Sequence, residues 1–144
     1  MGSLGSERCA VIALALDTHS VIWLLHADAR LSPVARQQID EATARGQQIA
    51  ISSITLVETA YLEEKGRVPA GTLRGLLALL DRPDPLVVEI PVSRQIIAAL
   101  LTISRETVPD MPDRVIAATA INLGVSLVSR DGKIRDSQVQ TVWR

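Results

Sequence analysis

Four acidic residues lie at positions where an α/β domain usually places its ligand site. They are Asp17, Glu58, Asp113 and Asp131. The first and the last follow apolar runs, and the other two lie near the start of helical patterns, on the apolar stripe. In an open sheet with helices on both faces, ligands bind at the carboxyl ends of the strands. Carboxylates gathered there repel one another unless they share a proton or hold a cation, and four acids with no nearby catalytic His favour the cation.

Glu58 is the most informative of the four acids. On a helix it would lie beside Ile54, Tyr61 and Leu62, and therefore on the apolar face. A carboxylate on a core-facing stripe is costly unless it is paired or binds a ligand. The other three acids also fit helix capping, compensation of a helix dipole, or a turn. Their common position at one edge of the predicted sheet favours a shared site over four separate structural roles.

The composition limits the classes of function. The chain has 144 residues, of which 47% are hydrophobic, and this fits one domain with a full core. Only Trp23, Tyr61 and Trp143 are aromatic, which disfavours a surface that stacks nucleic-acid bases. A net charge of -1 provides no bulk attraction to nucleic acid, so such binding would need a local basic patch. The single cysteine, Cys9, excludes an intrachain disulfide and fits the reducing cytoplasm.

The N-terminal segment predicts neither a signal peptide nor a membrane span. Its apolar run is about seven residues long, well short of the ~20 that a spanning helix needs, and no basic segment precedes it. We interpret residues 1–9 as a flexible leader and residues 10–144 as one domain. Other chemistries lack their motifs: the chain has no Gly-rich phosphate loop and no Gly-x-Ser-x-Gly elbow. His19 and His26 have no cysteine cluster to complete a zinc site.

Strand and helix patterns alternate along the chain. Strands are predicted at residues 10–16, 48–51, 86–90, 125–129 and 138–143. Helices are predicted at residues 18–26, 33–45, 53–65, 71–81, 93–104 and 113–123. Ser32, Ser53 and Ser93 are expected to cap helices, and Gly46 and Gly124 to end them. The alternation predicts an α/β fold: a mostly parallel central sheet of about five strands with helices on both faces.

The helix predicted at residues 71–81 is apolar around most of its circumference. Its apolar residues are Leu73, Leu76, Leu77, Leu79 and Leu80. A surface helix normally has one apolar stripe and an opposite polar face, and a domain of this size has little room to bury a helix on every side. We therefore expect this helix to contact a second copy of the chain or another protein.

Five segments carry recognisable motifs in order: Leu16–Leu25, Ile51–Glu58, Glu64–Arg67, Asp110–Ala120 and Leu127–Asp131. Together they resemble the PIN-domain ribonucleases, and most closely the VapC-type toxins of bacterial toxin–antitoxin pairs. The resemblance covers the chain from about Val11 to its end, and the order and spacing of the segments are more specific than any single motif. Val57 and Ile134 depart from the pattern, because relatives often have an aromatic residue at these two positions.

The resemblance implies a metal-dependent endoribonuclease in which Asp17, Glu58, Asp113 and Asp131 are the metal-binding and catalytic acids. It places Ser129 near the metal. It also implies a homodimer and a small antitoxin protein laid across the acidic groove. The chemistry of the residues agrees, because hard oxygen ligands suit Mg²⁺ or Mn²⁺.

Further residues near the predicted site are candidates for supporting roles. Thr18 and Asp110 are possible auxiliary residues, because each adjoins or lies close to one of the four acids. Arg114, Arg130 and Lys133 are candidates to bind the RNA backbone, because they lie beside the acids in the sequence. Solvated surface charge is the commoner fate of such basic residues.

Two alternative functions remain open at this point. One is a PIN-domain nuclease that processes RNA without an antitoxin. The other is a non-catalytic, cation-binding α/β scaffold, such as a receiver-like domain. A receiver would have paired acids after its first strand and a Lys after a late strand, whereas this chain has Thr18 and His19, and Arg130 and Asp131. A co-transcribed small antitoxin would distinguish the toxin from the RNA-processing nuclease.

Overall fold

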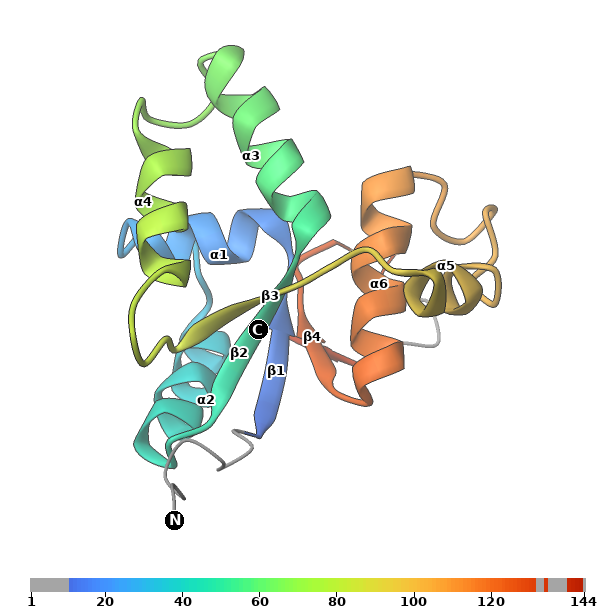
Figure 1. The fold of residues 1–144 in the computed structure, drawn as a ribbon, viewed down its shortest axis with the longest axis horizontal. Helices are drawn as coiled ribbons and strands as arrows, with labels where there is room; N and C mark the ends of the chain where they lie inside the picture. Colours follow the sequence, from blue (N-terminus) through green and yellow to red (C-terminus); the bar gives the residue numbers. More distant parts are fainter. Residues whose placement is uncertain (1–10, 132–133, 135–139, 144) are drawn as a thin grey trace.

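The structure is a computed structural model that describes residues 11–131, 134 and 140–143 (Figure 1). In this part of the chain five parallel strands form one sheet in the order β3-β2-β1-β4-β5. The strands are β1 Ile12–Leu16, β2 Gln48–Ser52, β3 Val87–Ile90, β4 Ser126–Val128 and β5 Thr141–Val142. The helices are α1 Thr18–Leu25, α2 Pro33–Ala44, α3 Ser53–Glu64, α4 Thr72–Leu80, α5 Arg94–Leu100 and α6 Met111–Leu123. The predicted fold class is confirmed, while the predicted leader, Cys9 and Lys133 lie outside the described residues.

Helices cover both faces of the sheet because successive strand residues point to opposite faces. Leu14 and Leu16 of β1 enter the core that α1, α2 and α4 close, and Ala15 between them enters the core under α5 and α6. Figure 1 shows these two groups of helices on opposite sides of the strands. On β2, Ala50 likewise faces α6. Small residues at these two positions let α6, itself rich in alanine, lie close to the sheet.

The strand order places β1 at the centre of the site-bearing edge. The chain runs from β1 outward through β2 to β3, and then returns across the sheet to β4 on the other side of β1. The backbone N–H of Asp17 donates to the Val128 carbonyl at 3.2 Å, which ties the ends of β1 and β4 together. The reversal of strand order beside β1 is the position where open α/β sheets bind their ligands. No helix in the described residues is long and apolar enough to cross a membrane.

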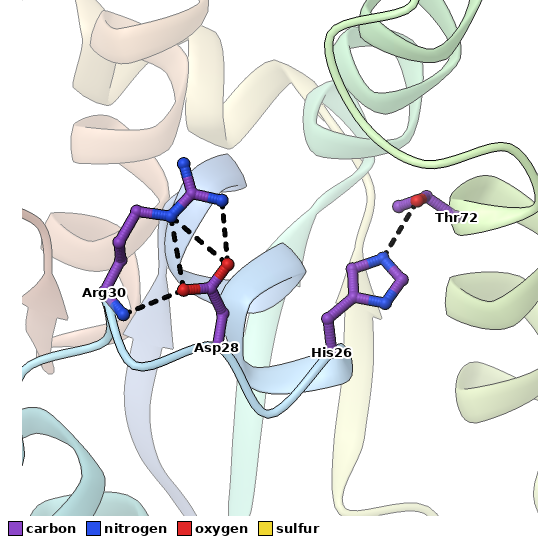
Figure 2. Close-up of polar contacts among 4 residues, drawn as sticks. All are labelled: His26, Asp28, Arg30 and Thr72. Carbon is purple, nitrogen blue, oxygen red and sulfur yellow. Dashed lines mark hydrogen bonds and ion pairs between the residues drawn. The ribbon is translucent and has the colours of Figure 1, made fainter.

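Helix α4 is buried more deeply than the sequence analysis expected. Leu76 is fully buried in the core, and Leu79 and Leu80 pack against that core. The helix lies against α1, α3 and β3, and Gly75 allows the side chain of Leu25 to approach closely. His26 at the end of α1 is hydrogen-bonded to the buried Thr72 hydroxyl at 2.9 Å (Figure 2). The chain's own core therefore accounts for Leu76 and part of Leu79 and Leu80, while Leu77 is 42% exposed, and an interface on this helix stays a prediction.

Ser52, not Ser53, caps α3. The Ser52 hydroxyl accepts a hydrogen bond from the Ile54 backbone N–H at 3.1 Å, so β2 passes directly into the helix. The hydroxyl of Ser53 instead donates to Glu89 on β3. The predicted caps Ser32 and Ser93 are confirmed.

Helices α5 and α6 also differ from their predicted bounds. Helix α5 ends at Leu100, and the Arg114 side chain donates to the carbonyls of Leu100 at its end and of Ile103 just beyond it. Helix α6 begins at Met111, two residues early, with Asp110 as its N-cap. Pro112 is tolerated because the first turn of a helix does not need its N–H.

Candidate active site

A pocket of about 600 Å³ opens at the carboxyl ends of the central strands. It is lined by Asp17, Thr18, His19, Trp23, Arg30, Glu58, Asp110, Asp113, Arg130 and Asp131. The structure therefore brings together the four acids on which the sequence analysis depended, although 114 positions separate the first from the last. Each acid comes from a different element or loop at this edge.

Asp17 has two roles at the end of β1. It is the N-cap of α1, where its carboxylate accepts the Ser20 backbone N–H at 2.9 Å, and it also lines the pocket. The capping interpretation and the site interpretation of this residue are thus compatible. Burial raises the pKa of Asp17, against the opposing effect of hydrogen bonds from Ser20 and from the buried Ser129.

Glu58 is held by a line of hydroxyl groups between α1 and α3. The Thr18 hydroxyl donates to a Glu58 carboxylate oxygen and lies 3.1 Å from the Thr55 hydroxyl. Both threonines are buried, so the buried side of α3 is polar here, while Tyr61 on the same helix is 54% exposed. The expectation of an apolar stripe beside Glu58 is therefore wrong, and the carboxylate is positioned by hydrogen bonding. Burial raises the pKa of Glu58, and the nearby charges of Asp110 and Asp17 add to this.

Asp113 lies among the charges of three other carboxyl groups of the pocket. Burial raises its pKa to about 8, and the negative charges of Asp110, Asp131 and Glu58 add to the effect. Asp110, the N-cap of α6, accepts the Asp113 backbone N–H at 3.1 Å, so a structural cap also contributes charge to the pocket. Carboxylates that raise one another's pKa must lie close together.

Asp131 and Ser129 extend the site beyond β4. Ser129 is fully buried, and its hydroxyl accepts the Asp131 backbone N–H at 3.1 Å. A carboxylate oxygen of Asp131 accepts the backbone N–H of Ile134 at 3.2 Å. Ser129 is therefore linked to both Asp17 and Asp131, which agrees with its predicted place beside the acids.

The donor set fits a hard divalent cation, although it does not form a ready coordination sphere. Among the described residues, no three Asp, Glu, His or Cys side chains are already arranged to hold a metal ion. The acids nevertheless face one pocket and raise the pKa of Asp113 and Glu58 through their charges, and a cation between them would reverse this repulsion. Oxygen ligands of this kind suit Mg²⁺ or Mn²⁺.

The three predicted RNA-binding residues have different positions. Arg130 lines the pocket. Arg114 does not: its guanidinium donates to the Leu100 and Ile103 carbonyls, so its role is to join α6 to α5, and we correct that assignment. Lys133 lies outside the described residues.

Three further pocket residues were not assigned to the site from the sequence: His19, Trp23 and Arg30. His19 and Trp23 lie on α1 just after Asp17, which is the signal that could have identified them.

A family comparison covers almost all of this architecture. The PIN domain family model matches residues 14–138. The chain belongs to the PIN-domain family. The matched range contains all four acids of the pocket, and it confirms the resemblance that the motifs carried.

Individual relatives agree with this assignment. The chain is 29% identical over 131 residues to Ribonuclease VapC22 of Mycobacterium tuberculosis, covering 89% of this chain and 96% of that protein. Among solved structures, VapBC2 from Rickettsia felis bound to a promoter DNA fragment matches with a TM-score of 0.69 at 20% identity, over 92% of this chain and 100% of the other. A toxin–antitoxin complex from Klebsiella pneumoniae matches with a TM-score of 0.59 at 24% identity, over 90% and 95% of the two chains. These two structural similarities show a shared fold.

Replacing Thr18 by Val should impair the site while leaving the fold intact. Valine has nearly the same shape but cannot donate to Glu58, so we expect RNA cleavage to slow about tenfold, or ~1.4 kcal/mol in the barrier. Stability should fall by about 1–3 kcal/mol, because the buried Thr55 hydroxyl loses its partner. Initial cleavage rates and urea unfolding would measure both effects. Thr18→Ser, which keeps the hydroxyl, should retain most activity, and an equal loss in both variants would contradict the positioning role.

The stability of the metal-free protein should fall as pH rises from about 4 to 8. The pKa of Asp113 is raised to about 8 from 3.8, so in this interval the folded state binds a proton that the unfolded state has released. Deprotonation of Asp113 in the folded state then costs stability, on the order of 1 kcal/mol because solvent screens a partly exposed group.

Urea unfolding in chelator at pH 5 and pH 8 would measure this effect in the wild type and in Asp113→Asn. The variant should lose less stability between the two pH values. The matched control Asp84→Asn, an exposed Asp before β3, should behave as the wild type. An identical pH dependence in Asp113→Asn and the wild type would contradict the prediction.

Proposed function

We propose that this protein is a metal-dependent endoribonuclease, and that it is the toxin of a VapBC-type toxin–antitoxin pair. The observation that carries the proposal is the convergence of Asp17, Glu58, Asp113 and Asp131 on one pocket in a PIN-domain chain. Similarity to Ribonuclease VapC22 along almost the whole chain supports the choice of RNA as substrate. The likeness to toxin–antitoxin complexes supports the choice of a toxin.

The four acids would hold Mg²⁺ or Mn²⁺, with Ser129 and Thr18 orienting Asp17 and Glu58. When bound in such a site, a divalent cation lowers the pKa of a coordinated water and stabilises charge on a phosphodiester. The protein's own contribution is to hold several carboxylates at fixed positions and to bind the RNA backbone with Arg130. Asp110 adds negative charge beside Asp113, so a cation bound in the pocket would be attracted more strongly.

The test is incubation of the protein with total RNA and Mg²⁺ or Mn²⁺, followed by mapping of the RNA ends. Discrete cuts by the wild type, and their absence with Asp17→Asn, are the expected result. Asp17→Asn keeps a side-chain oxygen that can cap α1, so the fold should survive. The matched control Asp84→Asn should cut as the wild type does. Failure of the wild type to cut any RNA with either ion would refute the proposal.

The acidic pocket is chemically suited to bind a basic side chain of an antitoxin. Carboxylates that raise one another's pKa would be stabilised by a Lys or Arg inserted among them, as they would by a metal. A partner segment that offers such a side chain would compete with both the cation and the RNA. This competition explains how a small protein could silence the nuclease without altering its fold.

A homodimer is expected to use α3 and α5 rather than α4. Large apolar side chains are exposed on these helices, with Val57 and Leu101 at 62% and 76%. Leu101 directly follows α5, and Val57 lies on α3. We expect the wild type to have the mass of a dimer in light scattering, and Val57→Lys with Leu101→Lys to reduce it to a monomer. Leu77→Lys, at a 42% exposed position on α4, is the control, and a monomeric wild type at high micromolar concentration would contradict the dimer.

A further inference from the structure

Two arginine side chains line the acidic pocket, and binding of a cation by the four acids does not require them. Arg30 and Arg130 both lie over the indole of Trp23, with their Cζ atoms 5.4 Å and 5.8 Å from a Trp23 ring centroid. All three residues line the pocket. Trp23 itself is only 7% exposed and packs against the rings of His19 and Trp143. The indole is therefore a fixed support for two guanidinium groups at the mouth of an acidic pocket.

The turn after α1 fixes Arg30 in this place. The Asp28 backbone N–H donates to the Trp23 carbonyl at 2.8 Å, and the Ala27 N–H donates to the Leu24 carbonyl at 3.2 Å. This pair of bonds is the Schellman pattern, which needs a left-handed residue and usually takes glycine. Here Ala27 has a φ of 52°. A non-glycine residue keeps such a conformation only when its surroundings impose it, and such residues are often found at functional sites.

Asp28 holds one edge of the Arg30 guanidinium and leaves another edge available. Nε and Nη2 of Arg30 donate to the Asp28 carboxylate, at 2.7 Å for the Nη2 bond, as Figure 2 shows. Nη1 makes no hydrogen bond within the part of the chain that the structure describes. The Arg30 side chain remains 64% exposed, so a ligand in the pocket can reach it.

We infer that Arg30 and Arg130, supported by Trp23, form a binding site for a backbone phosphate of single-stranded RNA, next to the phosphate that is cut. This inference rests on the proposed nuclease function. The five carboxylates in the pocket repel the negatively charged RNA backbone. A chain of net charge -1 has no overall attraction for RNA that would offset this repulsion. Guanidinium groups bind phosphate oxygens through paired hydrogen bonds, and a fixed guanidinium loses less freedom when it does so.

The location fits a neighbouring phosphate better than the reacting one. Trp23 lies six positions after Asp17, the N-cap of α1, which is roughly 9 Å at the rise of an α-helix. The indole that supports the two cations is therefore offset from Asp17, although both line the same pocket. Because Trp23 is buried, its ring offers no free face for stacking a base. The site should read the charge of the backbone and not the identity of the base.

The test measures RNA binding separately from cleavage. All proteins would carry Asp113→Asn, which we expect to bind RNA without cutting it, and the probe is a fluorescent single-stranded RNA of mixed sequence. Arg30→Ala should weaken binding about five- to tenfold and lower the slope of log Kd against log salt by about 0.7, the value for one phosphate contact on a single strand. Arg30→Lys should keep the slope because the charge remains. Arg82→Ala removes the same charge from an exposed loop before β3, at the opposite end of the strands, and should change neither quantity.

A second arm locates the contact on the RNA. Probes with a single uncharged methylphosphonate would be compared at each position around the mapped cut. One position beside the cut should weaken binding with Arg30 present and have no effect in Arg30→Ala. An unchanged Kd and salt slope in Arg30→Ala would overturn the inference, as would the absence of RNA binding in the Asp113→Asn protein that keeps Arg30.

The two proposals fail in different ways. If Arg30→Ala alters the salt slope but the wild type cuts no RNA, the contact of Arg30 with an RNA phosphate stands, and the nuclease function and the position beside a cut both fail. If the wild type cuts RNA but Arg30→Ala binds it with the same slope, the nuclease function stands and the phosphate site is wrong.

Discussion

Asp113→Asn should lower the rate of RNA cleavage at least about 100-fold, or ~2.7 kcal/mol in the barrier. Asp113 lies where the charges of Asp110, Asp131 and Glu58 meet, and its own pKa is raised to about 8. Asparagine keeps the shape of the side chain but removes the charge that would bind a cation. The helix should persist, because α6 is capped by the Asp110 carboxylate accepting a backbone N–H that the variant retains.

Asp113→Asn should also make the metal-free protein more stable, since one of several repelling charges is gone. A catalytic loss combined with a gain in stability is difficult to attribute to misfolding. Cleavage time courses at saturating Mg²⁺ and urea unfolding in chelator would measure the two effects, with Asp84→Asn as the charge-matched control. Full activity of Asp113→Asn at saturating Mg²⁺ would remove Asp113 from the proposed site.

Chelation of divalent cations should abolish cleavage, and the products formed with Mg²⁺ or Mn²⁺ should carry a 5′-phosphate and a 3′-hydroxyl. These ends follow from direct attack of water on the phosphodiester. Attack by the RNA's own 2′-hydroxyl would leave a 2′,3′-cyclic phosphate and normally needs a side chain such as His to transfer the proton. His19 lines the pocket and is exposed, so the structure contains a residue against which this alternative can be tested.

The decisive comparison is between the wild type and His19→Ala, with and without chelator. Under the metal-dependent route, His19→Ala should change the rate less than about tenfold and leave the product ends unaltered. Cleavage that persists in chelator, or cyclic phosphate ends that depend on His19, would contradict the proposed chemistry. Mapping the ends by ligation of adaptors before and after phosphatase treatment would identify which type is present.

The positions of the acids were predictable from the sequence because strand ends are easy to locate. The buried strand that stops at Leu16 puts Asp17 at the carboxyl edge, and parallel strands share that edge. The interaction that holds Glu58 was not predictable, since Thr18 and Thr55 lie 37 residues apart and meet only when α1 packs on α3. Arg114 was assigned to RNA binding because it adjoins Asp113 in the sequence. Its guanidinium instead donates to the carbonyls of Leu100 and Ile103.

Helix packing was the least predictable part of the structure. The leucines of α4 indicated a contact surface, but the pattern cannot distinguish a helix covered by another protein from one covered by α1, α3 and β3. Likewise, no motif in the sequence marks Arg30 or Trp23 as a residue of the site. Their relation depends on a left-handed residue at Ala27, and alanine gives no sign of that conformation. Local patterns thus located the acids, whereas the residues that hold or complement them required tertiary packing.

The central position of β1 has a consequence for the synthesis of this protein. Strand β1 leaves the ribosome well before its neighbour β4, which begins only at Ser126. The hydrogen bond from Asp17 to Val128, and the carboxylate of Asp131, are therefore lacking until more than 110 further residues have been translated after Asp17. A growing chain, or one released early, has no assembled acidic pocket. If the pocket cuts RNA, the nascent chain cannot attack any messenger before the segment from Asp113 to Asp131 has been made and has packed beside β1.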